Sequence, residues 1–82
     1  MYASRDTIEA LYDETAPAHL YRLARCQFVF LYRLAEGRSL ASIAEELEKA
    51  ERTLYVWRKI LVRQFKAEHF EQVMFIFGKL MA

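Results

Sequence analysis

The stretch that decides the fold runs from Gly37 to Lys59 and reads GRSLASIAEELEKAERTLYVWRK. Ser39 is a favourable N-cap, because its hydroxyl can accept a hydrogen bond from a first-turn backbone N–H. Gly37 can end a preceding helix in a left-handed conformation. Apolar residues then recur at helical spacing in two groups. The pattern predicts two short helices joined by a turn at residues 48–50.

Two short helices with this spacing form a helix-turn-helix, in which the first helix braces a second that enters the major groove of DNA. The stretch resembles the helix-turn-helix of small phage terminase subunits, transposases and small phage or bacterial transcription regulators. The matching positions are Ser39, Leu40, Ile43, Ala44, Leu47, Thr53, Leu54, Trp57, Arg58 and Lys59. The pattern is not complete, since Glu48 and Lys49 replace the usual glycine and aliphatic residue of the turn, and Ala50 replaces the usual serine cap. The resemblance implies binding to double-stranded DNA.

One continuous helix is the alternative for this stretch. Its apolar residues recur by three and four without a break, and neither Gly nor Pro occurs between Arg38 and Phe77. Such a heptad seam could pair with a second copy of the chain. A seam with the small Ala50 at one position and the bulky Trp57 at another packs poorly, so we favour the helix-turn-helix.

Composition indicates a single all-α domain, residues 1–82, of four to five helices. The sequence has only two glycines and one proline, so it offers few of the turn residues that connect the strands of a β-sheet. The chain is 55% hydrophobic and 15% aromatic, although a domain this short buries only about 60% of its unfolded surface. So much apolar surface predicts that a partner, most simply a second copy, covers part of it.

The single cysteine, Cys26, excludes an internal disulfide framework and fits a reducing compartment. The sequence has no visible signal peptide and no apolar run long enough to cross a membrane. We therefore expect a soluble cytoplasmic protein with no membrane partner, associated with the nucleoid if it binds DNA.

Helices are predicted on both sides of the motif. Their ranges are about 6–15, 17–36 and 68–81, around a helix-turn-helix at about 39–66. Asp6 suits a helix start with Glu9 as its capping partner, and Pro17 suits the first turn of the next helix. That second helix is apolar on several faces, which predicts a central place in the core or at an oligomer interface.

Basic residues gather in the second half of the motif. Five bases and no acid occur between Arg52 and Ala67. At helical spacing, one face carries Arg52, Tyr55, Lys59, Arg63 and Lys66, and another carries Leu54, Trp57, Leu61 and Phe65. A cationic face that includes an aromatic residue is typical of nucleic-acid binding. The bracing helix is acidic at Glu45, Glu46 and Glu48 and must turn these carboxylates away from phosphates.

The candidate DNA-binding residues follow from this placement. They are Arg38, Ser39, Ser42, Arg52, Thr53, Tyr55, Arg58, Lys59 and Arg63. Those at the start of the second helix, Arg52, Thr53 and Tyr55, are predicted to reach base edges, and the others to contact phosphates. Three further arginines, Arg22, Arg25 and Arg33, are expected along one edge of the preceding helix, more simply as a solvated face than as a phosphate track.

A protein-interaction module is the second hypothesis, favoured by the net charge of only +1 and the acidic bracing helix. It would act as an adaptor or inhibitor that binds a protein partner, or a second copy, through an aromatic-rich patch, with a helix-turn-helix that no longer reads DNA. The predicted patch residues are Phe28, Phe30, Tyr32, Phe70, Val73, Met74 and Phe77.

Nothing in the sequence predicts an enzyme, a metal site or a cofactor. His19 and His69 stand alone, without the spacing of zinc ligands. Cys26 lies in an apolar run and is expected to be a small buried hydrophobe instead of a nucleophile.

Overall fold

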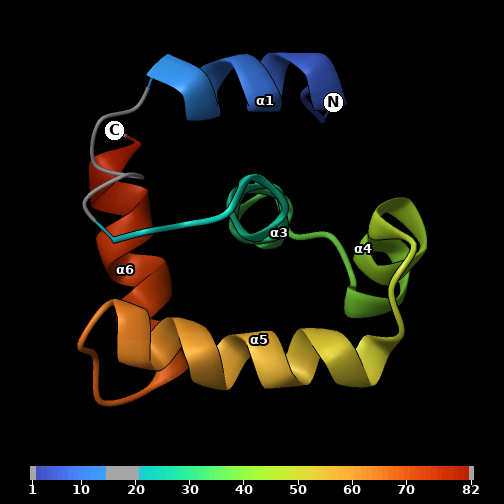
Figure 1. Cartoon of the computed structure of the whole chain (residues 1–82). Helices are drawn as coiled ribbons and strands as arrows, with labels where there is room; N and C mark the ends of the chain where they lie inside the picture. Colours follow the sequence, from blue (N-terminus) through green and yellow to red (C-terminus); the bar gives the residue numbers. More distant parts are fainter. Residues whose placement is uncertain (1, 15–20, 82) are drawn as a thin grey trace.

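The computed structural model describes residues 2–14 and 21–81, which fold into five α-helices without a strand (Figure 1). The helices are α1 (Arg5–Glu14), α3 (Arg25–Ala35), α4 (Leu40–Leu47), α5 (Glu51–Gln64) and α6 (Phe70–Leu80). The prediction of an all-α fold with a central helix-turn-helix is confirmed.

Helix α3 occupies the centre of the bundle. Figure 1 shows it end-on, with α1, α4, α5 and α6 arranged around it. Phe28 of α3 packs edge-to-face against Tyr12 of α1 and Phe77 of α6, with ring centroids 5.4 Å apart in both pairs. Phe30 packs in the same way against Trp57 of α5 at 5.7 Å. The predicted central position of this apolar helix is confirmed.

The turn between α4 and α5 lies at the predicted place. Glu48 ends α4 in a left-handed conformation, with φ 57° and ψ 44°. The N–H of Lys49 then bonds to the carbonyl of Ala44 at 2.9 Å, which satisfies a free carbonyl of the last helical turn. Ala50 is extended, at φ −74° and ψ 149°, and α5 follows it. The continuous helix is therefore excluded.

The second predicted helix begins later than expected. Its predicted start at Pro17 lies outside the described residues, but Tyr21 and Arg22 are not helical and α3 begins only at Arg25. The side-chain amide of Gln64, in α5, donates to the backbone carbonyls of both Tyr21 and Arg22 at 3.0 Å. Arg22 itself adopts φ 57°, which is incompatible with a right-handed helix. A contact with a distant helix thus replaces local helical hydrogen bonds.

The outer helices differ slightly from their predicted ends. Ser4, and not Asp6, caps α1, because its hydroxyl oxygen accepts the N–H of Thr7 at 3.1 Å. Ile8 is fully buried on the side of α1 that packs against α3. Helix α6 begins at Phe70, two residues later than predicted.

Candidate nucleic-acid interface

Helix α5 has one buried face and one exposed face. Leu54 and Leu61 are fully buried, Phe65 is nearly so, and Trp57 is half-buried. The opposite side is exposed along its length and carries Arg52, Tyr55, Val56, Lys59, Ile60 and Arg63. We call these six residues the α5 strip. The predicted separation of an apolar face from a basic one is confirmed.

The cations of the α5 strip have no carboxylate partner among the described residues. Arg52, Lys59 and Arg63 are exposed, and every ion pair of the described chain involves other residues. Tyr55, near the start of the helix, is 52% exposed. Cations that the chain leaves unpaired are available to replace counterions on a nucleic-acid backbone. Thr53 is half-buried beside the strip.

Arg58 lies at the edge of the α5 strip, where α5 meets α6. Its guanidinium carbon is 4.8 Å from the ring centroid of Phe70 and 5.8 Å from that of Tyr55. These distances are typical of cation–π contacts. A hollow of about 290 Å³ opens here, lined by Tyr55, Arg58, Lys59, Val62 and Phe70. Arg58 is half-buried and packs on aromatic rings, whereas the other candidate cations of α5 extend from its surface.

The three candidates at the start of α4 are engaged inside the chain. Ser39 is the N-cap, as predicted, and its hydroxyl oxygen accepts the N–H of Ser42 at 3.1 Å. The hydroxyl of Ser42 accepts hydrogen bonds from Arg38 at 2.6 and 3.2 Å. The same guanidinium pairs with Glu46 at 3.2 Å. These contacts occupy the polar groups of Arg38, Ser39 and Ser42 that the sequence assigned to phosphates.

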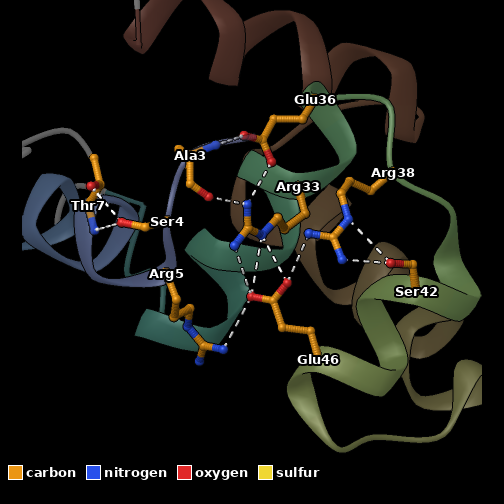
Figure 2. A network of polar contacts seen from close by, with 9 residues as sticks. All are labelled: Ala3, Ser4, Arg5, Thr7, Arg33, Glu36, Arg38, Ser42 and Glu46. Atoms are coloured by element: carbon orange, nitrogen blue, oxygen red, sulfur yellow. Dashed lines mark hydrogen bonds and ion pairs between the residues drawn. The ribbon is translucent and has the colours of Figure 1, made fainter. Parts of the chain in front are cut away.

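A buried polar network joins the N-terminal segment, α3 and α4, and Arg33 is its centre (Figure 2). Arg33 is only 4% exposed. Its Nη1 donates to the carbonyl of Ala3 at 2.6 Å and to Glu36 at 2.9 Å. Its Nε lies 3.0 Å from Oε1 of Glu46, and the other carboxylate oxygen of Glu46, Oε2, pairs with Arg5 at 3.4 Å. The network encloses one full guanidinium charge within the fold.

Hydrogen bonds outweigh burial in setting the ionisation of this network. Burial lowers the pKa of Arg33, but its hydrogen bonds to Glu36 and Glu46 leave that pKa above its ordinary value. Burial raises the pKa of Glu36, but the backbone N–H of Ala3, at 2.8 Å, and the guanidinium of Arg33 together hold that pKa below its ordinary value. Both groups are therefore charged at neutral pH.

The expectation that Arg22, Arg25 and Arg33 line one edge of α3 is wrong. Arg33 is buried, Arg25 pairs with Asp13 at 2.7 Å, and Arg22 lies before the helix begins. The expectation assumed that one continuous helix would align the three residues, and the late start of α3 removes that alignment.

The acids of α4 are divided between the interior and the surface. Glu46 faces the buried network, so its charge is neutralised by arginines. Glu45 and Glu48 are exposed. The bracing helix thus turns one of its three predicted carboxylates inward and keeps two in solvent.

The predicted partner patch is mostly core. Phe28, Phe30, Val73 and Phe77 are between 0% and 2% exposed, so they pack within this chain and cannot reach a partner in this fold. The remaining three, Tyr32, Phe70 and Met74, are half-buried. The aromatic residues that suggested an interface mostly pack in the core, between α3 and the helices around it.

Three exposed apolar residues were missed by the sequence reasoning. Val56 and Ile60 of the α5 strip are 53% and 40% exposed, and Phe75 of α6 is 65% exposed. Val56 and Ile60 follow Arg52 at intervals of four, so extending the helical spacing from Arg52 would have placed both on the exposed face. Phe75 lies under the ammonium of Lys79, at 4.7 Å.

No group of three metal-ligating side chains occurs among the described residues. His69 is exposed and Cys26 is half-buried, less enclosed than predicted; His19 lies outside the described part of the chain. None of the helices described is long and apolar enough to span a membrane.

No protein-family model, curated protein or solved structure matches the chain.

Proposed function

We propose that the chain is a small helix-turn-helix protein that binds double-stranded DNA and acts as a transcription regulator. The observation that carries the proposal is the α5 strip, where three exposed cations without an ion-pair partner in the described part of the chain lie beside an exposed tyrosine. Helix α5 also follows a short left-handed turn from a bracing helix, which is the arrangement of groove-reading helices.

The length of α5 suits this role. Fourteen residues at about 1.5 Å per residue give a helix of about 21 Å, longer than the roughly 12 Å width of the major groove. One half of the helix can lie among base edges while the other approaches the backbone. On this proposal Arg52, Thr53 and Tyr55 reach base edges, while Lys59 and Arg63 contact phosphates and Arg58 supports the adjoining edge.

Binding to random-sequence duplex DNA, measured by fluorescence anisotropy across a salt series, tests the proposal. Each phosphate contact contributes about 0.9 to the slope of log affinity against log salt, so binding must weaken steeply as salt rises. The double variant Arg52→Ala with Lys59→Ala should abolish measurable binding, whereas Lys79→Ala, on α6, should leave it close to wild type. Absence of binding at low salt would refute the proposal.

A homodimer is the form in which we expect the protein to bind, because two copies would read paired half-sites about 34 Å apart. Sedimentation equilibrium of the free protein and of its DNA complex measures this. A single copy per DNA duplex at saturation would reject the dimer and leave the groove-reading helix unaffected. DNA binding would place the protein at the nucleoid.

A protein-interaction module is the second candidate function, favoured by the exposed Val56 and Ile60 in the middle of the α5 strip. Exposed acids at Glu48 and Glu51, next to the start of α5, favour it as well, since carboxylates repel phosphates. Apolar contacts of this kind persist at high salt. Salt-resistant capture of a protein that the Val56→Ser, Ile60→Ser double variant loses would support this candidate over DNA binding.

A further inference from the structure

A second cationic feature lies at the C-terminal end of α5. A hollow of about 470 Å³ is lined there by Tyr21, Arg22, Arg63, Gln64 and Lys66. The three cations, Arg22, Arg63 and Lys66, are exposed, and none forms an ion pair with another described residue. None of the described residues that line the hollow carries a carboxylate. Of these three cations, Arg63 is a candidate DNA-binding residue, whereas Arg22 and Lys66 are not.

Specific contacts hold this hollow together. The amide nitrogen of Gln64 donates to the carbonyls of Tyr21 and Arg22 at 3.0 Å, and its amide oxygen accepts from Gln27 at 3.2 Å. The ring of Tyr21 stacks on Phe65, with centroids 4.4 Å apart and planes 4° from parallel. The segment that carries Arg22 is therefore fixed against the end of α5 by two independent contacts. Arg22 is held beside cations that are more than 40 residues away along the sequence.

Capping of α5 does not account for these cations. Three of the last four carbonyls of the helix already accept backbone N–H groups, with Phe65 bonded to Leu61, Lys66 to Arg63 and Ala67 to Val62. The helix dipole places only about half a negative charge at a C-terminus, and three unit positive charges exceed it severalfold. An excess of positive charge remains, and an anion would complement it.

We propose that this hollow binds a phosphate group, which DNA supplies from the backbone strand that flanks the groove. This inference rests on the proposed function and extends its contact surface. Arg63 belongs both to the α5 strip and to the hollow, so the two cationic features are continuous. From Arg52 to Arg63 the helix rises about 16 Å, more than the roughly 12 Å width of the major groove. A helix that reads bases near Arg52 therefore meets a phosphate near Arg63.

The first test compares three single variants that each remove one exposed positive charge. Duplex binding is measured by anisotropy across a salt series for wild type, for Lys66→Gln and Arg22→Gln in the hollow, and for Lys79→Gln on α6. Loss of one phosphate contact removes about 0.9 from the salt slope, which corresponds to about 8-fold weaker binding at 0.1 M salt. We expect this loss for Lys66→Gln and for Arg22→Gln, and neither change for Lys79→Gln.

The second test uses inorganic phosphate without DNA. Amide chemical shifts of ¹⁵N-labelled protein are followed as phosphate replaces chloride at constant ionic strength and pH. We expect saturable shifts at Arg22 and at residues 63–67 in wild type, and a clear loss of these shifts in Lys66→Gln. Thermal unfolding of each variant verifies that it is folded, so that a lost signal reports the site.

The two tests separate the inference from the proposed function. Suppose that wild type binds DNA, but Lys66→Gln and Arg22→Gln have the same slope of log affinity against log salt as Lys79→Gln. The hollow then does not contact the DNA backbone, and the groove-reading role still stands. If wild type binds no DNA, the proposed function and the backbone source both fail. Saturable phosphate shifts would then assign the hollow to a free phosphorylated ligand, and their absence would overturn the site altogether.

Discussion

The substitution Glu48→Gly tests the turn on which the helix-turn-helix depends. Glu48 adopts φ 57° and ψ 44°, a conformation that costs an L-amino acid roughly 1–2 kcal/mol. Glycine removes this cost but has more freedom in the unfolded chain, which opposes the gain by about 0.4–1 kcal/mol. The side chain of Glu48 is exposed and makes no hydrogen bond or ion pair with a described residue, so its removal loses no contact. The free energy of unfolding should rise by about 0.5–1 kcal/mol.

Thermal unfolding followed by circular dichroism measures this effect. For a domain of this size, 1 kcal/mol corresponds to a shift of roughly 4–8 °C in Tm, so we expect Tm to rise by about 2–8 °C. The matched control is Glu45→Gly, which removes an exposed glutamate from the interior of α4. There glycine should destabilise by roughly 0.5–1 kcal/mol. If both variants are destabilised alike, residue 48 is helical and the turn does not exist.

Three further predictions concern stability. Arg33→Met should lower the free energy of unfolding by about 2 kcal/mol in urea titrations, because it removes the charged hydrogen bonds of a buried guanidinium to Glu36 and Glu46, although Glu46 keeps Arg5 and Arg38 as partners. The exposed Arg63→Met should change it by less than about 0.5 kcal/mol. The pKa of Glu36 is lower in the folded chain than in the unfolded one. The ionised carboxylate of Glu36 therefore contributes fully to the free energy of unfolding above the unfolded pKa of about 4.3, and this contribution is lost as pH falls below that value. Between neutral and acidic pH, the free energy of unfolding of Glu36→Gln should therefore fall by less than that of wild type. Ser39→Ala should cost about 1 kcal/mol through loss of the N-cap of α4, and an unchanged Tm would contradict that role.

Local sequence signals were sufficient to predict most of the secondary structure. The hydroxyl of Ser39 and the left-handed Gly37, at φ 86°, act where the sequence placed a cap and a helix end. The apolar spacing of Leu54 and Leu61 correctly identified the buried face of α5. The cap, the helix end and the buried face each depend on residues within one or two helical turns of each other. The local sequence is therefore enough to determine these features.

Features that depend on distant residues could not be predicted in this way. The non-helical segment before α3 is held by Gln64, more than 40 residues from the backbone groups that it binds. The burial of Arg33 depends on Glu46, a carboxylate of α4 that the sequence presented as part of an acidic surface. Helical spacing places a residue on a face, but it does not say which other element covers that face.

The candidate site was predicted in part for the same reason. The exposed cations of α5 follow from spacing alone, whereas the internal pairing of Arg38 requires the position of Glu46. The cationic hollow was not predicted, because Arg22 reaches it only after α5 and the segment before α3 have come together. Sites assembled from one helix are readable from sequence, and sites assembled from two segments are not.

The central position of α3 also has a consequence for synthesis of the protein on the ribosome. Its phenylalanines pack against α5 and α6, and roughly 40 residues separate the end of α3 from Phe77. At about 5–20 residues per second, translation takes roughly 2–8 s to supply that covering surface. During this interval the nascent chain exposes the phenylalanines of α3 that the folded protein buries, which favours chaperone binding until α5 and α6 are available to cover them.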